Sequence, residues 1–177
     1  MRTRKALALT FVWALFVVVA VHFVQFPGSV PDFTSVSGGG TLLDAVPAFT
    51  PDATYQRLAD YGEAGRRNYA FRNVTVDVLL PLSVLPFLFL LMLRAVTPLA
   101  RHRIIRALLL SLPFVYVIFD LLENSAVLVL LANYPERLDR LAGSLAYVTM
   151  VKRVASLLAL LAPLALWISA RLRTAKH

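Results

Sequence analysis

The sequence predicts an all-α membrane protein in which four transmembrane helices form a bundle. The chain of 177 residues is 59% apolar and has a mean hydropathy of +0.71, whereas soluble domains are about 45–50% apolar. Four apolar stretches are long enough to cross a bilayer, because a spanning helix needs about 20 residues. Basic residues flank these stretches, as is usual for membrane helices. We therefore expect a single membrane domain over residues 1–177.

The composition also excludes several classes of function. The chain has no cysteine, which rules out disulfides, cysteine-ligated zinc, iron–sulfur clusters and thiol nucleophiles. Its three histidines are too few for a histidine-rich metal centre. The net charge of +8 does not indicate nucleic acid, because the basic residues lie beside apolar stretches rather than on a soluble face.

Residues 6–26 form the first predicted span. Arg2, Arg4 and Lys5 precede this run, an arrangement shared with secretory signals. The run of about 20 residues is longer than a usual signal core, and no Ala-x-Ala-like site precedes Pro27. We therefore expect an uncleaved signal anchor.

Residues 27–72 form a polar connection on the outer side. Its first part, residues 27–47, contains three prolines and a glycine triplet and predicts an irregular loop. Thr50 then fits an N-cap and Pro51 fits the first helical position. We expect a helix over residues 51–69 that lies on or near the membrane surface.

The other three spans are predicted at residues 73–93, 107–131 and 145–170. Each contains proline, which membrane helices tolerate where neighbouring groups satisfy the freed backbone atoms. We expect these prolines to kink the helices; they are Pro81, Pro86, Pro113 and Pro163.

The charge distribution predicts the orientation. The N-terminus, the 94–106 loop and the C-terminal tail carry ten basic residues and no acidic one. The positive-inside rule then places both termini in the cytoplasm, and the 27–72 and 132–144 loops outside. The bias toward Ala, Leu, Val and Arg is typical of GC-rich bacterial coding, so we expect a bacterial inner (cytoplasmic) membrane.

Ionisable residues recur at one depth in the four spans. Counted from the nearest basic residue at the cytoplasmic end of each helix, the separation is 17 residues for His22, Asp77 and Glu123, and 19 for Lys152. Seventeen residues of helix rise about 25 Å, and the hydrocarbon core is about 30 Å thick. These residues are therefore expected in the outer half of the bilayer. Asp120, 14 residues from its reference arginine, lies deeper.

The helical periodicity groups these residues into stripes. Helix positions four, seven and eight residues apart share a face, which joins Tyr116, Asp120, Glu123 and Asn124 on the third span. Corresponding stripes are Thr149, Lys152 and Ser156 on the fourth span and Asn73, Asp77 and Pro81 on the second. If the stripes face inward, they enclose a polar pocket that opens outward. Glu123 and Lys152 are nearly equidistant from the 135–139 turn, so we expect them to pair.

Charged groups inside a membrane are functional candidates by default. Three carboxyls, Asp77, Asp120 and Glu123, together with His22, suit acid–base chemistry or a hard metal ion. Lys152, Asn124 and Tyr116 are candidate ligand-binding residues. Arg66, Arg67 and Arg72 approach the outer mouth and suit a phosphate or carboxylate head group. The favoured interpretation is a site that binds or modifies a lipid-like amphiphile.

Other interpretations stay open. Lys152 and His22 also fit interfacial positions at helix ends, and the acids fit a structural layer that locks the bundle or a homo-oligomer. The chain is then a non-catalytic subunit or scaffold with a partner membrane protein. A proton- or ion-coupled transporter would need an oligomer. The sequence does not decide whether the protein is an enzyme, and it identifies no metal or cofactor.

One run of residues resembles a known group. Its members are Tyr55, Leu58, Gly62, Gly65, Arg66, Tyr69, Asp77, Pro81, Asp120, Glu123, Asn124, Pro135 and Lys152. Over residues 51–153 this pattern is similar to that of small uncharacterised bacterial four-span integral membrane proteins, a group with no assigned activity. The resemblance therefore implies the architecture and the choice of polar residues only. In outline the chain also resembles claudins, without their Trp and paired-Cys signature, and the sterol isomerase and sigma-2 receptor group.

Overall fold

The computed structural model describes residues 2–99 and 102–174 and is helical, with no strand in these residues. Its elements are α1 (Arg2–Phe23), α2 (Val30–Val36), α3 (Pro51–Asp60), α4 (Gly62–Val74), α5 (Val76–Ala95), the 3-10 helix η1 (Thr97–Leu99), α6 (Arg103–Asn133) and α7 (Asp139–Thr174).

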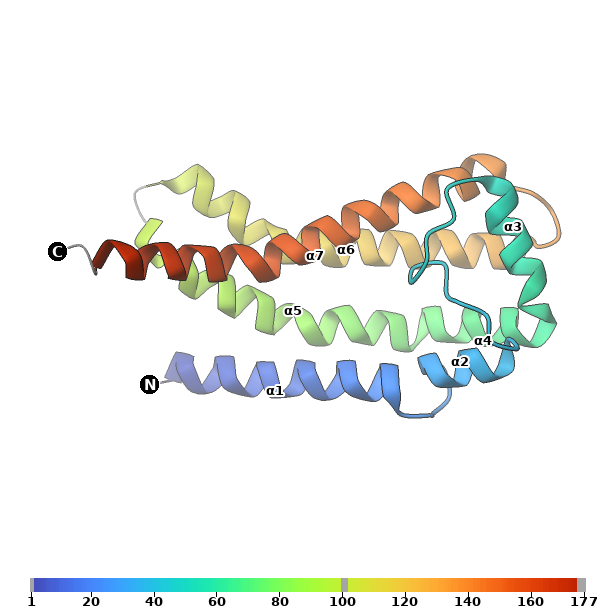
Figure 1. Cartoon of the computed structure of the whole chain (residues 1–177), viewed down its shortest axis with the longest axis horizontal. Coiled ribbons are helices and arrows are strands. Elements are labelled where there is room, and N and C mark those ends of the chain that lie inside the picture. The colour runs from blue at the N-terminus through green and yellow to red at the C-terminus, as the bar shows by residue number, and fades with distance from the viewer. Residues whose placement is uncertain (1, 100–101, 175–177) are drawn as a thin grey trace.

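Four apolar helical stretches in the described residues are long enough to cross a membrane. They are Thr3–Phe23, Gly62–Ala95, Arg103–Asn133 and Asp139–Leu172. Figure 1 shows the long helices side by side, with both termini at one end. The predicted all-α bundle of four spans is confirmed. The helices that contain the third and fourth predicted spans begin before those spans, at Arg103 and Asp139.

The connection between the first two spans is more ordered than predicted. Within the segment expected to be an irregular loop, Val30–Val36 forms helix α2. The Ser29 hydroxyl accepts a hydrogen bond from the backbone N–H of Asp32 at 3.2 Å, and the Asp32 carboxylate accepts one from the N–H of Gly28 at 2.9 Å. These two hydrogen bonds resemble a capping box. They stabilise the start of a helix that is only 7 residues long.

The helix expected over residues 51–69 is divided in two. Thr50 caps α3 as predicted, accepting from the N–H of Ala53. The helix ends at Asp60, and Gly62 adopts a φ of +63°, a conformation that glycine reaches without steric cost. α4 then runs in line with α5 instead of lying across the bundle (Figure 1). Of the two helices, only α3 crosses the end of the bundle.

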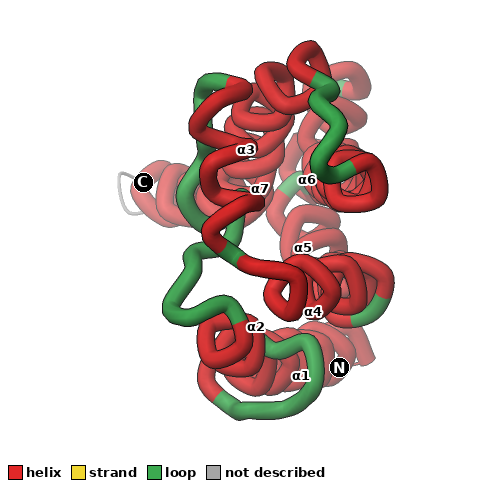
Figure 2. Tube along the Cα trace, turned by 90° about the vertical axis from the view of Figure 1, so that its right-hand side faces the viewer, coloured by secondary structure: helices red, strands yellow, loops and turns green. Residues whose placement is uncertain are grey.

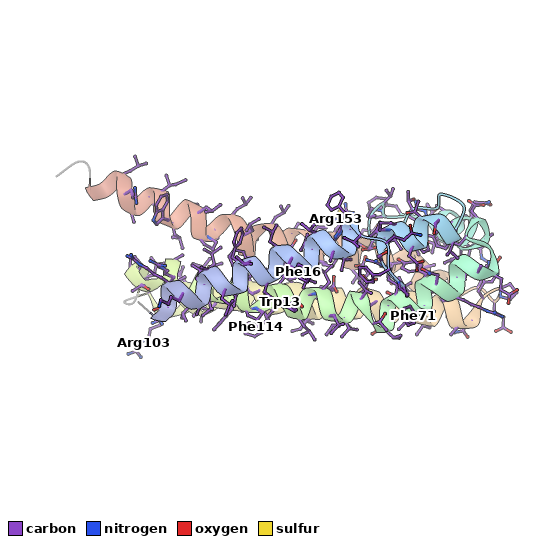
Figure 3. All side chains as sticks on the ribbon, turned by 90° about the horizontal axis from the view of Figure 1, so that it is seen from below. Trp13, Phe16, Phe71, Arg103, Phe114 and Arg153 are labelled. Atoms are coloured by element: carbon purple, nitrogen blue, oxygen red, sulfur yellow. The ribbon has the colours of Figure 1, made fainter. Side chains whose placement is uncertain are left out.

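The best-packed region is the end of the bundle that α2 and α3 cover, here called the capped end (Figure 2). Its core contains Phe33, Leu43, Leu58, Tyr61 and Tyr69 from the connection, together with Leu130 and Leu145 from α6 and α7. Farther along, large side chains such as Trp13 and Phe16 on α1 are exposed (Figure 3). The chain therefore packs tightly at the capped end and leaves its apolar surface for lipid along the helices.

Candidate functional site

The polar stripes of α6 and α7 meet inside the bundle near the capped end. The Lys152 ammonium forms ion pairs with the Glu123 carboxylate and, at 3.3 Å, with the Asp120 carboxylate. The hydroxyl of Thr149, one turn before Lys152, donates a hydrogen bond to Glu123. Glu123 is 1% exposed, so its charge is compensated by these two groups rather than by water.

Arg72 and Asp77 form a further ion pair, which joins the two halves of the long α4–α5 segment. An Arg72 Nη atom lies 2.7 Å from the Asp77 carboxylate, and its other Nη donates to the carbonyl of Gly28 at 2.8 Å. The side-chain amide of Asn124 donates to the backbone carbonyl of Asp77 at 3.0 Å and to the Asp120 carboxylate at 3.3 Å. The Arg72–Asp77 ion pair and the two ion pairs of Lys152 therefore belong to one network, the polar cluster, that links α4, α5, α6 and α7.

Residues 41–49 cross over this cluster and are called the strap. Arg153 of α7, labelled in Figure 3, donates to the carbonyls of Asp44 and Ala45, both at 2.7 Å. The Asp44 carboxylate lies 3.9 Å from the Lys152 ammonium. The Tyr61 hydroxyl donates to the carbonyl of Thr41 at 2.6 Å. The strap is therefore fixed at its start and along its middle.

The predicted pocket that opens outward would lie between the polar stripes of α5, α6 and α7. Ion pairs fill the space between the stripes, the strap covers it, and the side chains of Lys152 and Asp120 are each 12% exposed. The expected pairing of Glu123 with Lys152 is present. Asp77, Asp120, Glu123, Asn124 and Lys152 are brought together.

His22 is separate from the carboxylates. Its side chain is exposed, with Nδ1 2.8 Å from the carbonyl oxygen of Val18. It lines a different space, a cavity of about 410 Å³ between α1, α5, α6 and α7, here called the side cavity. Tyr116 and Ser156 are the other polar residues there, and apolar side chains such as Phe11, Val84 and Leu160 form the rest of the wall.

The side cavity begins one helical turn from the polar cluster. Tyr116 precedes Asp120 by four residues and Ser156 follows Lys152 by four, and such pairs share a helix face. Tyr116 therefore belongs to the wall of the side cavity and not to the ion-pair network. The polar side chains of the cavity come from three helices, α1, α6 and α7.

The three predicted head-group arginines do not converge. Arg66 donates to the carbonyl of Leu58 at 2.9 Å and stacks 4.1 Å from the centre of the Tyr134 ring. Arg67 pairs with Glu63 on the exposed face of α4, and Arg72 is buried against Asp77. The sequence placed all three near the outer mouth because depth alone does not distinguish the faces of α4.

Sequence reasoning also missed Asp44 and Arg153 as parts of the site. Asp44 lies in a loop without periodicity, so no sequence pattern linked it to Lys152. One signal was present: Arg153 directly follows Lys152, and a second cation at that depth needs its own acceptors. In the described residues no three His, Asp or Glu side chains are grouped so that they could hold a metal ion.

Among the described residues outside the spans, Tyr61 and Arg137 have shifted pKa values. Burial raises the pKa of the Tyr61 phenol, although nearby Arg57 opposes the shift. The hydrogen bonds that exposed Arg137 donates to the carboxylates of Asp52 and Asp139 raise the pKa of its guanidinium. Arg137 thereby ties the start of α3 to the start of α7.

No family model, curated protein or solved structure matches this chain. The four candidate spans make it a multi-pass membrane protein. The resemblance to small bacterial four-span proteins stays a prediction.

Proposed function

We propose that this integral membrane protein binds a lipid-like amphiphile in the side cavity. The observation that carries the proposal is a cavity of about 410 Å³ whose wall is almost wholly apolar, with His22, Tyr116 and Ser156 as its polar side chains. Ligand sites generally combine an apolar wall with a few convergent polar groups. Such a wall suits a hydrocarbon chain.

The polar groups indicate what kind of head the amphiphile carries. Tyr116 and Ser156 bear hydroxyls. A neutral histidine whose Nδ1 donates to the Val18 carbonyl has Nε2 as an acceptor. The ion pairs of the polar cluster compensate one another one turn away. A small uncharged head with oxygen atoms, such as an alcohol or a carbonyl, therefore fits better than a phosphate.

A matched pair of α5 variants tests this proposal. Val84 lines the side cavity, whereas Leu82 is exposed on another face. The wild type, Val84→Phe and Leu82→Phe are purified in a mild detergent, and retained lipids are identified by native mass spectrometry. We expect a defined apolar lipid in the wild type and Leu82→Phe, and its loss from Val84→Phe. Absence of lipid from the wild type, or equal retention by all three proteins, contradicts the proposal.

A second candidate is a non-catalytic subunit or scaffold of a membrane complex. It is favoured by the internal pairing of Arg72 with Asp77 and of Lys152 with Asp120 and Glu123, because such networks can serve to hold helices together. A stoichiometric partner chain that co-purifies, with no lipid in the side cavity, supports this candidate.

The proposed orientation places both termini in the cytoplasm of a bacterium and the strap on the outer face of its inner membrane. The asymmetry of the basic residues supports it. Because the chain contains no cysteine, single cysteines can be placed at Thr3 and at the exposed Ser35. A membrane-impermeant maleimide should label Ser35→Cys on intact spheroplasts and Thr3→Cys only after lysis; the reverse result inverts the topology.

A further inference from the structure

The end of the bundle opposite the capped end is basic and holds no acidic side chain. All ten acidic residues lie within 32–77 and 120–139, and none lies in residues 1–27, 78–119 or 140–177. The start of α1, the end of α7 and the 3-10 helix η1 gather at this end (Figure 1). The sequence therefore supplies no Asp or Glu side chain at this end to pair with Arg4 and Arg94.

Two of these arginines line one cavity although they are 90 residues apart in the sequence. Arg4 on α1 and Arg94 on α5 form part of the wall of a space of about 270 Å³, with the hydroxyl-bearing Thr3 and Thr97. A general excess of positive charge at this end would not by itself bring two arginines from different helices to the wall of one cavity. The cavity therefore has the composition of an anion site, since arginine and hydroxyl groups both donate to phosphate oxygens.

Arg94 also borders an apolar groove. This groove, of about 500 Å³, is lined by Leu7, Leu91, Leu164 and Trp167, among others. Arg171 stacks 4.2 Å from the centre of the Trp167 ring. An anion site thus opens beside a space that fits a hydrocarbon chain, and Arg94 belongs to both.

We propose that this end binds an anionic phospholipid, with the phosphate between Arg4 and Arg94 and one acyl chain in the groove beside Trp167. Charge complementarity selects this occupant, because basic pockets between membrane helices bind anionic head groups. The adjoining groove distinguishes a phospholipid from an acidic protein segment, which would leave the apolar space unfilled. This site is independent of the side cavity.

The position of Trp167 allows binding to be measured directly. In a Trp13→Phe background Trp167 is the only tryptophan, and bromine on an acyl chain quenches tryptophan fluorescence on contact. The purified protein in mixed micelles is titrated with dibrominated phosphatidylglycerol or with phosphatidylcholine carrying the same chains. Each arginine near a membrane surface favours an anionic lipid by about fivefold, so two arginines favour phosphatidylglycerol by at most roughly 25-fold.

Three variants distinguish a specific binding site for the lipid from non-specific attraction by the basic surface. Arg94→Gln and Arg4→Gln should each lower the preference for phosphatidylglycerol about fivefold. Arg103→Gln is the matched control, because Arg103 is an exposed arginine at the same end (Figure 3); it should change the preference less than twofold. Equal quenching of the wild type by the two lipids overturns the proposal. An equal loss of this preference in all three variants indicates non-specific attraction and also overturns the proposal. Quenching that a soluble acidic peptide prevents overturns it as well. Arg4 is exposed near the start of α1, so its variant keeps the test valid if Arg94→Gln fails to fold.

Discussion

Replacing Arg72 by methionine measures how strongly the polar cluster depends on internal charge compensation. The Arg72 side chain is 2% exposed and that of Asp77 is 9% exposed. Arg72→Met leaves a buried carboxylate without its cation and also removes the donor to the Gly28 carbonyl. Breaking one partner of a buried pair costs about 3–5 kcal/mol, so we expect the free energy of unfolding to fall by that amount. Replacing both charges, in Arg72→Met/Asp77→Leu, removes the uncompensated group and should recover most of the loss.

The assay is unfolding by titration with sodium dodecyl sulfate in mixed micelles, followed by circular dichroism. Arg67→Met is the control, because Arg67 and Glu63 form an ion pair whose side chains are 80% and 71% exposed. Exposed pairs contribute about 0–1 kcal/mol. The reasoning is refuted if Arg72→Met is no more destabilising than Arg67→Met, or if the double variant loses the sum of its two single variants.

Three further perturbations follow from the connection between α1 and α4. Because the pKa of Tyr61 is raised by burial, the unfolded chain releases this proton near pH 10 while the folded chain keeps it. Stability should therefore fall as pH rises above about 10, with a shallower fall for Tyr61→Phe in a series of thermal melts. Gly28 has a φ of +82°, and an added Cβ would lie 3.1 Å from a methyl group of Val76, so Gly28→Ala should cost about 1–3 kcal/mol in the same detergent titration; an unchanged midpoint refutes this. Arg153→Ala should speed amide hydrogen exchange around Asp44 with little effect on global stability, whereas a cooperative loss of stability would show that the strap is part of the core.

The parts of this structure that sequence could predict are those governed by helical periodicity. Apolar length determined the four spans, and spacing along each helix placed Asp120, Glu123 and Asn124 on one face toward Lys152. Distance from a shared turn was enough to expect the pairing of Glu123 with Lys152. These inferences succeed because the rise and rotation per residue of a helix are fixed.

The parts that sequence could not predict depend on contacts between distant segments. Asp44 reaches the polar cluster through the strap, whose path follows from hydrogen bonds of its backbone with Arg153 and Tyr61. The different environments of Arg66 and Arg72 follow from α4 continuing α5 instead of turning along the surface. Neither backbone path leaves a periodic signal, because loops and helix breaks are set by tertiary contacts.

Because the polar cluster does not line the side cavity, we expect substitutions in the cluster to change stability and substitutions in the cavity wall to change lipid binding. Glu123→Gln removes the charge that pairs with Lys152 but keeps an acceptor for the Thr149 hydroxyl. Since Glu123 does not line the side cavity, this variant should unfold at lower detergent concentration and still retain the lipid sought by native mass spectrometry. Tyr116→Phe, in contrast, removes a hydroxyl from the cavity wall, and the loss of one hydrogen bond of about 1 kcal/mol should weaken lipid retention roughly fivefold. If Glu123→Gln loses the lipid while Tyr116→Phe retains it, the ligand lies within the ion pairs and the cavity assignment is wrong.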